Sequence, residues 1–254
     1  MILLEQKIVF PFADTPALCA ACRHLAQHGI LIADQPTPDV THLLLSVPSF
    51  DADGSLRGGG DFLKLRSCLT DDVTIVGGNL THSLLEKERK LDLLENPYYI
   101  ARNAALTADG AMRLAAQKLQ VSFLECPMLI IGWGRIGKCL AKLLQNMGAQ
   151  VWVAVRKEQD QAMLEALGYR SLFIHQIHTM IAHWSVIFNT APAPVLTQKE
   201  LRLCRKDCVK IDLASQRGME GEDILWFRGI PGKMLPESSG RLIAECILRK
   251  ERIT

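Results

Sequence analysis

The stretch that decides the fold is Leu129-Ile130-Ile131-Gly132-Trp133-Gly134-Arg135-Ile136-Gly137. Three apolar residues, typical of the end of a buried β-strand, run directly into glycines with the spacing GxGxxG. After them, apolar residues recur on one face of an expected helix that stops at Gly148, and a second strand is expected over residues 151–155. The pattern therefore predicts a strand, a glycine turn, a helix and another strand in succession.

Each glycine of this loop has a physical role in holding a dinucleotide. Gly132 makes the tight turn, Gly134 lets the backbone approach a pyrophosphate, and Gly137 lets the helix pack closely on the strand. The following helix presents unpaired N–H groups and partial positive charge to the phosphates. We therefore predict dinucleotide binding; a glycine turn that only packs two elements together is the alternative. The other predicted cofactor-binding members of the loop are Trp133, Arg135 and Ile136.

The end of the second strand indicates which dinucleotide is bound. NAD sites usually place a carboxylate there for the ribose hydroxyls, whereas this chain has Arg156 and Lys157. A guanidinium can grip a 2′-phosphate through two parallel hydrogen bonds. The pair therefore favours NADP. The alternative is a solvated basic pair, with NAD held by other groups.

Two later strands, expected over residues 185–188 and 209–213, end in small polar residues. The carboxyl ends of parallel strands line the crevice where cofactor and substrate meet. Asn189 and Thr190 are therefore candidates to touch the nicotinamide ribose, with ordinary turn chemistry as the alternative, and Asp212 can equally be structural. The remaining predicted cofactor contacts here are Ala191, Pro192 and Ala214. Thr197 and Glu200 are expected to form a capping box.

The first hundred residues also alternate between strand-like and helix-like segments, which predicts a parallel sheet with crossover helices. Strands are expected over 7–11, 41–47 and 73–76, and a helix between Thr15 and Gly29. Residues 49–60 are expected to be a mobile, ligand-contacting loop. A linker helix capped by Thr107 and running to Gln117 is expected to follow.

These segments predict two domains. Residues 1–104 are expected to form an amino-terminal α/β domain on the substrate side, and residues 105–254 an NAD(P)-binding Rossmann domain. A final helix over about 238–254 can pack back on the first domain. Before it, residues 229–236 are expected to form a rigid loop, in which Lys233 is either a grip for a substrate carboxylate or a surface cation.

Composition excludes several other classes. The 254 residues are 48% hydrophobic with a net charge of +2, which argues against a nucleic-acid partner. No apolar run approaches the roughly 18 residues of a membrane span, and Glu5 to Lys7 interrupt any signal-peptide pattern. We therefore expect a cytoplasmic protein. The pairs Cys19/Cys22 and Cys204/Cys208 are interpreted as core cysteines on helices, and no metal site is expected.

Several motifs together resemble the dipicolinate synthase A subunits of spore-forming bacteria. The resemblance covers the second half of the chain well and the first hundred residues loosely. It rests on Thr107-Ala108-Asp109-Gly110-Ala111, residues 131–138, Asn189-Thr190-Ala191-Pro192, Ile211-Asp212-Leu213-Ala214-Ser215, and Pro231-Gly232-Lys233 with Pro236.

This resemblance implies two Rossmann-like domains with parallel sheets, separated by a cleft. It implies a role in sporulation, in NADP-linked oxidation of a dihydrodipicolinate-type ring to dipicolinate, and it implies a partner, a flavoprotein-like B subunit. Lys233, Arg102 and backbone N–H groups near residues 46–49 are then candidates to grip the two substrate carboxylates. We also expect a homo-oligomer.

Two other functions stay open. The amino-terminal domain is short and no histidine stands in a motif position that suits a general base, which favours a non-catalytic NAD(P)-binding regulatory or partner protein. His175, His178 and His183 are interpreted as structural. A dehydrogenase of the 2-hydroxyacid or alanine type is the third interpretation.

Overall fold

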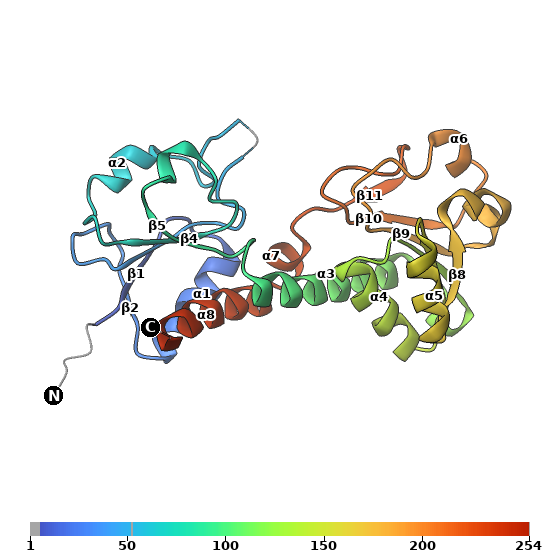
Figure 1. Ribbon diagram of the computed structural model, residues 1–254, viewed down its shortest axis with the longest axis horizontal. Helices are drawn as coiled ribbons and strands as arrows, with labels where there is room; N and C mark the ends of the chain where they lie inside the picture. Colours follow the sequence, from blue (N-terminus) through green and yellow to red (C-terminus); the bar gives the residue numbers. More distant parts are fainter. Residues whose placement is uncertain (1–5, 52, 254) are drawn as a thin grey trace. The chain divides into compact units, whose positions relative to one another are not determined.

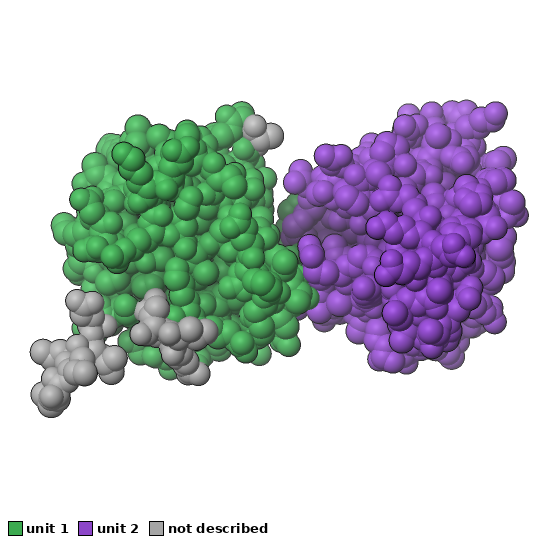
Figure 2. All heavy atoms as spheres, in the orientation of Figure 1, with its two compact units in different colours: residues 1–103, 231–254 green, residues 104–230 purple. Residues whose placement is uncertain are grey.

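A computed structural model describes residues 6–51 and 53–253, with side chains up to residue 250. Glu5, which bore on the signal-peptide expectation, lies outside this range. The chain divides into two compact units (Figure 2): unit 1 comprises residues 1–103 and 231–254, and unit 2 comprises residues 104–230. Unit 1 therefore includes all of residues 231–254. The sequence had predicted that these residues belong to the second domain and that only the final helix, from about residue 238, can pack on the first.

Unit 1 contains a five-stranded sheet in which every neighbouring pair is parallel (Figure 1). The order is β2-β1-β3-β4-β5, an arrangement known from flavodoxin-like folds. The strands are β1 (Ile8–Pro11), β2 (Leu31–Ile32), β3 (His42–Leu44), β4 (Thr74–Gly77) and β5 (Arg89–Asp92). The three expected strands of this half are present; the short edge strands β2 and β5 were not expected.

Helices cover both faces of this sheet because its strands are apolar on both sides. Leu43 and Ile75 join the cluster that includes Phe62 and Leu65 of α2 (Phe62–Arg66). Leu44 is buried on the opposite face, since successive strand residues alternate. Helix α1 (Pro16–Gln27) contacts β1 and β2, and it begins as expected, because the Thr15 hydroxyl accepts a hydrogen bond from the Leu18 N–H.

The last helix, α8 (Pro236–Ile253), packs on α1 within unit 1. The two helices approach so closely that a Cβ on Gly240 would collide with the backbone of Ala17 and lie 2.6 Å from the Ala21 nitrogen. At residue 240 the crossing therefore requires glycine.

The expected linker helix is longer than its cap signal indicated. Helix α3 spans Pro97–Lys118, so Thr107 lies in its middle and is not its N-cap. Asn96 is the cap, because its side-chain oxygen accepts from the N–H groups of Tyr98 and Tyr99 at 3.0 and 3.1 Å. Pro97 begins the helix, because proline is favoured at the first helical position, where its missing N–H costs nothing.

Unit 2 contains a six-stranded sheet, again parallel throughout, in the order β11-β10-β9-β6-β7-β8. Numbered within the unit, this is the 3-2-1-4-5-6 order of dinucleotide-binding Rossmann folds. The order reverses between β6 and β9, where such folds open a crevice for ligands. The strands are β6 (Pro127–Ile131), β7 (Gln150–Val155), β8 (Arg170–Phe173), β9 (Val186–Asn189), β10 (Val209–Asp212) and β11 (Ile224–Trp226).

Both faces of this sheet are covered as well. Leu129 and Ile131 lie in a cluster with Ile177 and Ile181 of the 3-10 segment η3 (Ile174–His183) and with Leu201 of α6 (Gln198–Leu201). On the other side lie α4 (Arg135–Asn146) and α5 (Glu158–Ala166) (Figure 1). The capping box between Thr197 and Glu200 is present. The prediction of two parallel α/β domains of Rossmann type is therefore confirmed.

The segment expected to be a rigid loop is partly helical. Residues 230–234 form the short helix α7 (Ile230–Met234), and α8 begins at Pro236, two residues before the expected start. The remaining short segments are η1 (Ser83–Leu85) and η2 (Phe123–Glu125). None of the described helices is long and apolar enough to cross a membrane.

Candidate dinucleotide site

The predicted cofactor residues of unit 2 follow the carboxyl ends of four neighbouring strands. Ile131, the last residue of β6, is in register with Ala154 of β7 and with Asn189 of β9, which is in turn in register with Asp212 of β10. Because the strands are parallel, the segments after them leave the sheet at one edge. The segments that follow the four strands, which include residues 132, 156, 190 and 214, therefore start at one edge of the sheet.

The first glycine of the loop is required by its conformation and by its neighbour. Gly132 has φ +102°, which L-residues rarely adopt, and its N–H donates to the Ala154 carbonyl at 2.9 Å. A Cβ at this position would lie 2.7 Å from Oγ1 of Thr190. The turn therefore closes directly beside the chain that leaves β9, at the point where the strand order reverses.

The last glycine of the loop is required by packing. Gly137 is buried in the first turns of α4, and a Cβ there would collide with the carbonyl oxygen of Gly132. Helix and turn can approach each other this closely only when residue 137 has no side chain. The sequence-based role given to Gly137 agrees with this geometry.

The start of α4 is open. Gly134 is its N-cap, with extended backbone angles of φ −79° and ψ −169° and no side-chain cap hydrogen bond. It is exposed, and a Cβ added to it would meet no atom within 4 Å. The first N–H groups of a twelve-residue helix are thus left to solvent or to an anion, together with the positive end of the helix dipole. A pyrophosphate fits this feature.

The other members of the loop have different surroundings. The ring of Trp133 packs edge-on against Tyr169, with centroids 5.5 Å apart, and Nζ of Lys138 lies 5.8 Å from the Trp133 ring. Trp133 therefore packs the glycine loop against Tyr169, the residue before β8. Ile136 is half-buried and Arg135 is exposed at the start of α4.

The side chain of Asn189 forms hydrogen bonds within the protein. The residue is fully buried, and its amide nitrogen donates to the Ala191 carbonyl at 3.1 Å and to Asp212 at 2.9 Å. Its amide oxygen accepts from the Ala191 N–H at 3.0 Å. The side chain therefore shapes the turn after β9, which agrees with the alternative of ordinary turn chemistry.

The rest of this turn is more accessible. The Thr190 hydroxyl donates to the Ile131 carbonyl at 2.9 Å, but the residue is only half-buried and keeps exposed surface. Ala191 is half-buried and Pro192 is exposed. Of the four cofactor contacts predicted at the end of β9, these three have solvent-exposed surface and Asn189 has none.

Asp212 is structural. Its carboxylate is fully buried and accepts four hydrogen bonds. One oxygen accepts from Asn189 and, at 3.1 Å, from the Ala214 N–H; the other accepts from the N–H groups of Gly218 and Met219 at 2.8 and 3.1 Å. A single carboxylate thus holds the turn after β9 and the loop after β10. Its charge is balanced by converging N–H dipoles, since none of these four donors is charged.

Trp226 is a residue of this edge that sequence analysis missed. It ends β11, is 43% exposed, and its indole N–H donates to the Ala214 carbonyl at 3.1 Å. Ala214 itself, predicted as a cofactor contact, is buried. No motif marks an aromatic residue at this place, and only the pairing of β10 with β11 brings it there.

Arg156 and Lys157 lie at the position expected for groups that select the cofactor. Both are exposed directly after β7, and neither forms an ion pair with the described residues. Lys157 also occupies the N-cap position of α5 without a side-chain cap bond. Two cations are therefore displayed at the sheet edge next to the strand that precedes the glycine loop.

The two candidates for catalysis belong to unit 1, whereas the predicted cofactor residues belong to unit 2. Arg102 is exposed on α3, and Lys233 is exposed on α7. The backbone near residues 46–49 is in part already used, because the Ser49 N–H donates to the Gly78 carbonyl at 2.8 Å. Ser49 therefore has no free N–H for a carboxylate.

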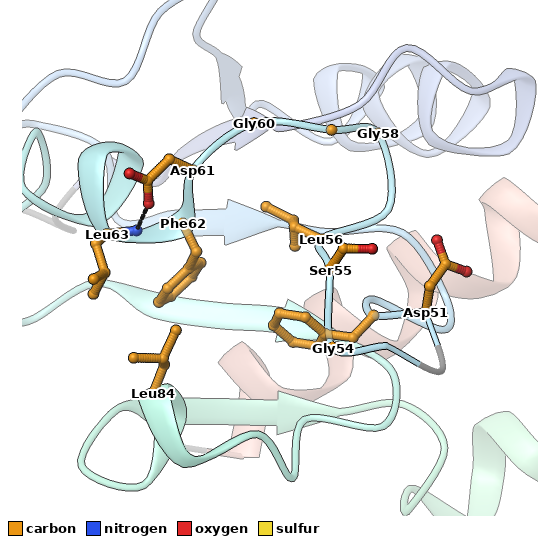
Figure 3. A pocket seen from close by; sticks show the side chains of 12 residues that line it. Asp51, Gly54, Ser55, Leu56, Gly58, Gly60, Asp61, Phe62, Leu63 and Leu84 are labelled. Atoms are coloured by element: carbon orange, nitrogen blue, oxygen red, sulfur yellow. Dashed lines mark hydrogen bonds between the residues drawn. The ribbon is translucent and has the colours of Figure 1, made fainter.

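The expected loop at 49–60 lines a hollow of about 670 Å³ in unit 1 (Figure 3). Phe50, Leu56 and Phe62 are among the apolar residues that line it. The glycines Gly58 and Gly60 lie on the strand of chain that borders it. The carboxylate of Asp61 turns away from the hollow to accept the Leu63 N–H at 2.9 Å. The loop is thus a wall of a pocket; residue 52 lies outside the described part of the chain.

Comparison with known proteins agrees with this geometry. Residues 100–216 match the NAD-binding domain of the D-isomer specific 2-hydroxyacid dehydrogenases. The A subunit of dipicolinate synthase from Bacillus subtilis is 24% identical over 169 residues, which cover 63% of this chain and 57% of that protein. The aligned segment thus spans little more than half of this relative.

Two solved structures share the fold over nearly the whole chain. The dipicolinate synthase A subunit from Bacillus halodurans has a TM-score of 0.80 at 20% identity, with 98% of this chain and 99% of that chain covered. The corresponding protein from Bacillus subtilis has a TM-score of 0.78 at 20% identity, with 99% and 97% covered. The family match supports a nicotinamide dinucleotide as the ligand of residues 100–216. These findings also confirm the resemblance found in the motifs: in sequence and fold, this chain is similar to the A subunit of dipicolinate synthase.

Proposed function

We propose that this protein is an NADP-dependent oxidoreductase that oxidises a dihydrodipicolinate-type ring to dipicolinate. The observation that carries the proposal is the open start of α4, where Gly134 leaves the first helical N–H groups without a side-chain cap. The resemblance to the A subunit of dipicolinate synthase supplies the substrate class.

In this proposal the sheet edge of unit 2 holds the two halves of the dinucleotide in different ways. The N–H groups at the start of α4 bind the pyrophosphate, and the guanidinium of Arg156 with Lys157 neutralises the 2′-phosphate. The turn after β9, fixed by Asn189 and Asp212, lines the nicotinamide half. The bound cofactor would accept a hydride from the ring, and the proton that the ring also loses would pass to solvent.

Positioning is the main contribution of the chain to the rate, because aromatisation of the ring supplies driving force. Arg102 and Lys233 are the proposed grips for the two substrate carboxylates. A flavoprotein-like B subunit, together with assembly into a homo-oligomer, completes the proposal on the strength of the resemblance alone.

Cofactor choice is tested by thermal melting with NADP and with NAD. A ligand present at a hundred times its dissociation constant stabilises the folded state by about 2.7 kcal/mol, which raises the melting temperature. We expect NADP to act at lower concentration than NAD, and Arg156→Glu to remove that preference. The matched control is Lys142→Glu, which reverses the charge of an exposed lysine on α4. This variant should keep the preference for NADP. Equal potency of the two dinucleotides on the parent protein would contradict the choice of NADP.

Catalysis is tested by following the absorbance of the reduced cofactor after a dihydrodipicolinate source is added, with and without the flavoprotein partner. A rise in absorbance supports the oxidation, and no rise in either arm contradicts it.

A specific observation favours a non-catalytic NAD(P)-binding protein as second candidate: the polar side chains of Asn189 and Asp212 already form hydrogen bonds within the protein. Binding without turnover would establish that second candidate.

A further inference from the structure

A short hairpin follows β3 and lies at the carboxyl edge of the unit 1 sheet. Phe50 and Leu56 pair across it in an antiparallel bridge, and the Arg57 N–H donates to the Ser49 carbonyl at 2.9 Å. The Ser49 N–H in turn donates to the carbonyl of Gly78, directly after β4, at 2.8 Å. Arg57 is therefore joined through Ser49 to the end of a central strand.

The next residue in the chain places Arg57 beside β1 as well. A Cβ added to Gly58 would lie 3.0 Å from the Cβ of Ala13, which stands two residues beyond the end of β1. The strand order β2-β1-β3-β4-β5 reverses between β1 and β3. Open α/β sheets bind ligands at this reversal, outside the carboxyl ends of the strands. Arg57 thus lies at the position in unit 1 where a ligand is expected.

The side chain of Arg57 is fixed at Nε and accessible at its terminal nitrogens. Nε is buried and lies 2.8 Å from a carboxylate oxygen of Asp51, in an ion pair without the alignment of a hydrogen bond. The terminal nitrogens donate to none of the described residues, and neither of them is buried without a partner. They therefore reach the surface, and the side chain is 37% exposed. Such a planar pair of donors matches the two oxygens of a carboxylate.

Arg57 is also the single cation at this edge of the sheet. By sequence, no other lysine or arginine lies between the end of any of the five described strands and the start of the element that follows it. The segments compared are 12–15, 33–41, 45–61, 78–82 and 93–96. Arg102 and Lys233 lie instead on the helices α3 and α7. A carboxylate that reaches the carboxyl edge therefore meets one guanidinium, at the switch point.

The nearest acidic residues in the chain already have partners. Asp53 accepts from the Ser55 N–H and hydroxyl at 3.0 and 2.7 Å, and Asp61 caps α2. Asp51 is paired with Arg57 itself. These contacts leave the outer nitrogens of Arg57 to a ligand.

We propose that Arg57 binds one carboxylate of the substrate, in addition to the grips proposed on Arg102 and Lys233, and so helps to select a dicarboxylate. The inference rests on the proposed function, because the dihydrodipicolinate-type ring supplies the ligand class. Asp51 orients the guanidinium from Nε, so that the terminal nitrogens can form parallel hydrogen bonds with the carboxylate. Arg57 thereby contributes binding and orientation, and no proton or electron passes through it.

The test compares two ring ligands by calorimetric titration of the full-length protein, with and without NADP. Dipicolinate carries two carboxylates, and pyridine-2-carboxylate is the same ring with one. We expect the parent protein to bind dipicolinate more tightly. Arg57→Gln should weaken dipicolinate by about tenfold to a hundredfold, because a hydrogen bond to a charged group is lost. Arg57→Lys, which keeps the charge but loses the paired donors, should weaken it less.

Arg89→Gln is the matched control. Arg89 also pairs with an aspartate, Asp72 at 3.4 Å, but it begins β5 and therefore lies at the amino edge of the sheet. This variant should bind both ligands as the parent does. Equal affinity of the parent and Arg57→Gln for dipicolinate would overturn the inference and leave the proposed function standing. A parent protein that binds no dipicolinate in either arm would overturn both, whereas binding through Arg57 without oxidation would contradict the proposed reaction alone.

A second measurement needs no variant. Phenylglyoxal modifies accessible guanidinium groups, and mass spectrometry of the peptides follows each arginine of the parent protein. Dipicolinate at a hundred times its dissociation constant should slow the modification of Arg57 by about a hundredfold, because only about one molecule in a hundred is then free. The rate at Arg89 should not change. An Arg57 that dipicolinate does not protect would contradict the inference, even if the substituted proteins failed to fold.

Discussion

The two glycine-rich segments of this chain, residues 58–60 and 132–137, differ in the helices they lead into. Gly58, Gly59 and Gly60 all have positive φ angles, and they precede Asp61, whose carboxylate accepts from the Leu63 and Lys64 N–H groups at 2.9 and 3.4 Å. The helix that begins there, α2, has only five residues. The loop at 132–137 instead leads into a twelve-residue helix whose cap is a glycine without any side-chain bond.

The comparison shows that glycine content alone does not make an anion site. In unit 1 the helix start is already satisfied by its own aspartate, and that negative charge also offsets the helix dipole. In unit 2 the N–H groups and the dipole stay available. The chemical signal in the sequence is therefore the cap residue, aspartate at 61 and glycine at 134, more than the number of glycines.

The largest effect is expected from Gly137→Ala. The new Cβ would collide with the Gly132 carbonyl oxygen, so we expect a loss of about 1–3 kcal/mol in the free energy of unfolding and loss of dinucleotide binding. Denaturant unfolding and calorimetric titration measure the two effects. Gly232→Ala, where a Cβ meets no atom within 4 Å, is the control. Unchanged stability would contradict the close approach of α4 to the turn.

Gly134→Ala should separate binding from folding. A Cβ there meets no protein atom within 4 Å, so stability should change by less than about 1 kcal/mol. If a pyrophosphate rests against this backbone, the dissociation constant should rise by about tenfold or more, which corresponds to about 1.4 kcal/mol. An unaltered dissociation constant, measured by calorimetry, would show that the ligand does not approach residue 134.

Asp61→Ala tests the capped segment. Removing the cap should lower the stability of the protein by about 1 kcal/mol, because two helix N–H groups lose their acceptor. Dinucleotide affinity should stay at the parent value. A weakened affinity would mean that the loop at 58–60 takes part in binding, and the contrast between the two segments would fail.

The smallest effect concerns the capped start of α6. The pKa of Glu200 is lowered by hydrogen bonds from the Thr197 N–H and hydroxyl at 2.8 and 2.7 Å. A lowered carboxyl pKa contributes stability above its ordinary value of 4.5, and this contribution is lost as the pH falls through the folded value. Glu200→Gln should therefore cost less than about 1 kcal/mol at neutral pH. Unfolding curves of the two proteins should converge in acid; a constant difference would rule out the carboxylate as its origin.

Much of the fold could be predicted because its signals are local. A strand that runs into GxGxxG, and a threonine followed by proline at a helix start, each specify their structure within a few residues. The start of α3 was missed because Thr107 was taken as the cap, although Asn96, directly before Pro97, is a good cap residue. The edge strand β5 was missed because its sequence, Arg-Lys-Leu-Asp, is mostly polar and becomes a strand only by pairing with β4.

The candidate site was predicted less completely, for a physical reason. The glycine loop carries its function in its own backbone, but Asn189 and Asp212 acquire theirs from each other across two strands. Trp226 reaches Ala214 only because β11 pairs with β10. Partners so far apart in the chain leave no spacing pattern for sequence reasoning to detect.

The return of α8 to unit 1 has a consequence for biosynthesis. Unit 2 is continuous in the chain, whereas unit 1 needs residues 231–254 as well as residues 1–103. A ribosome therefore delivers all of unit 2 before α8 has emerged, and until then the surface of α1 that α8 contacts stays uncovered. Synthesis of unit 1 therefore starts before that of unit 2, but unit 1 can complete its fold only after unit 2 has been synthesised.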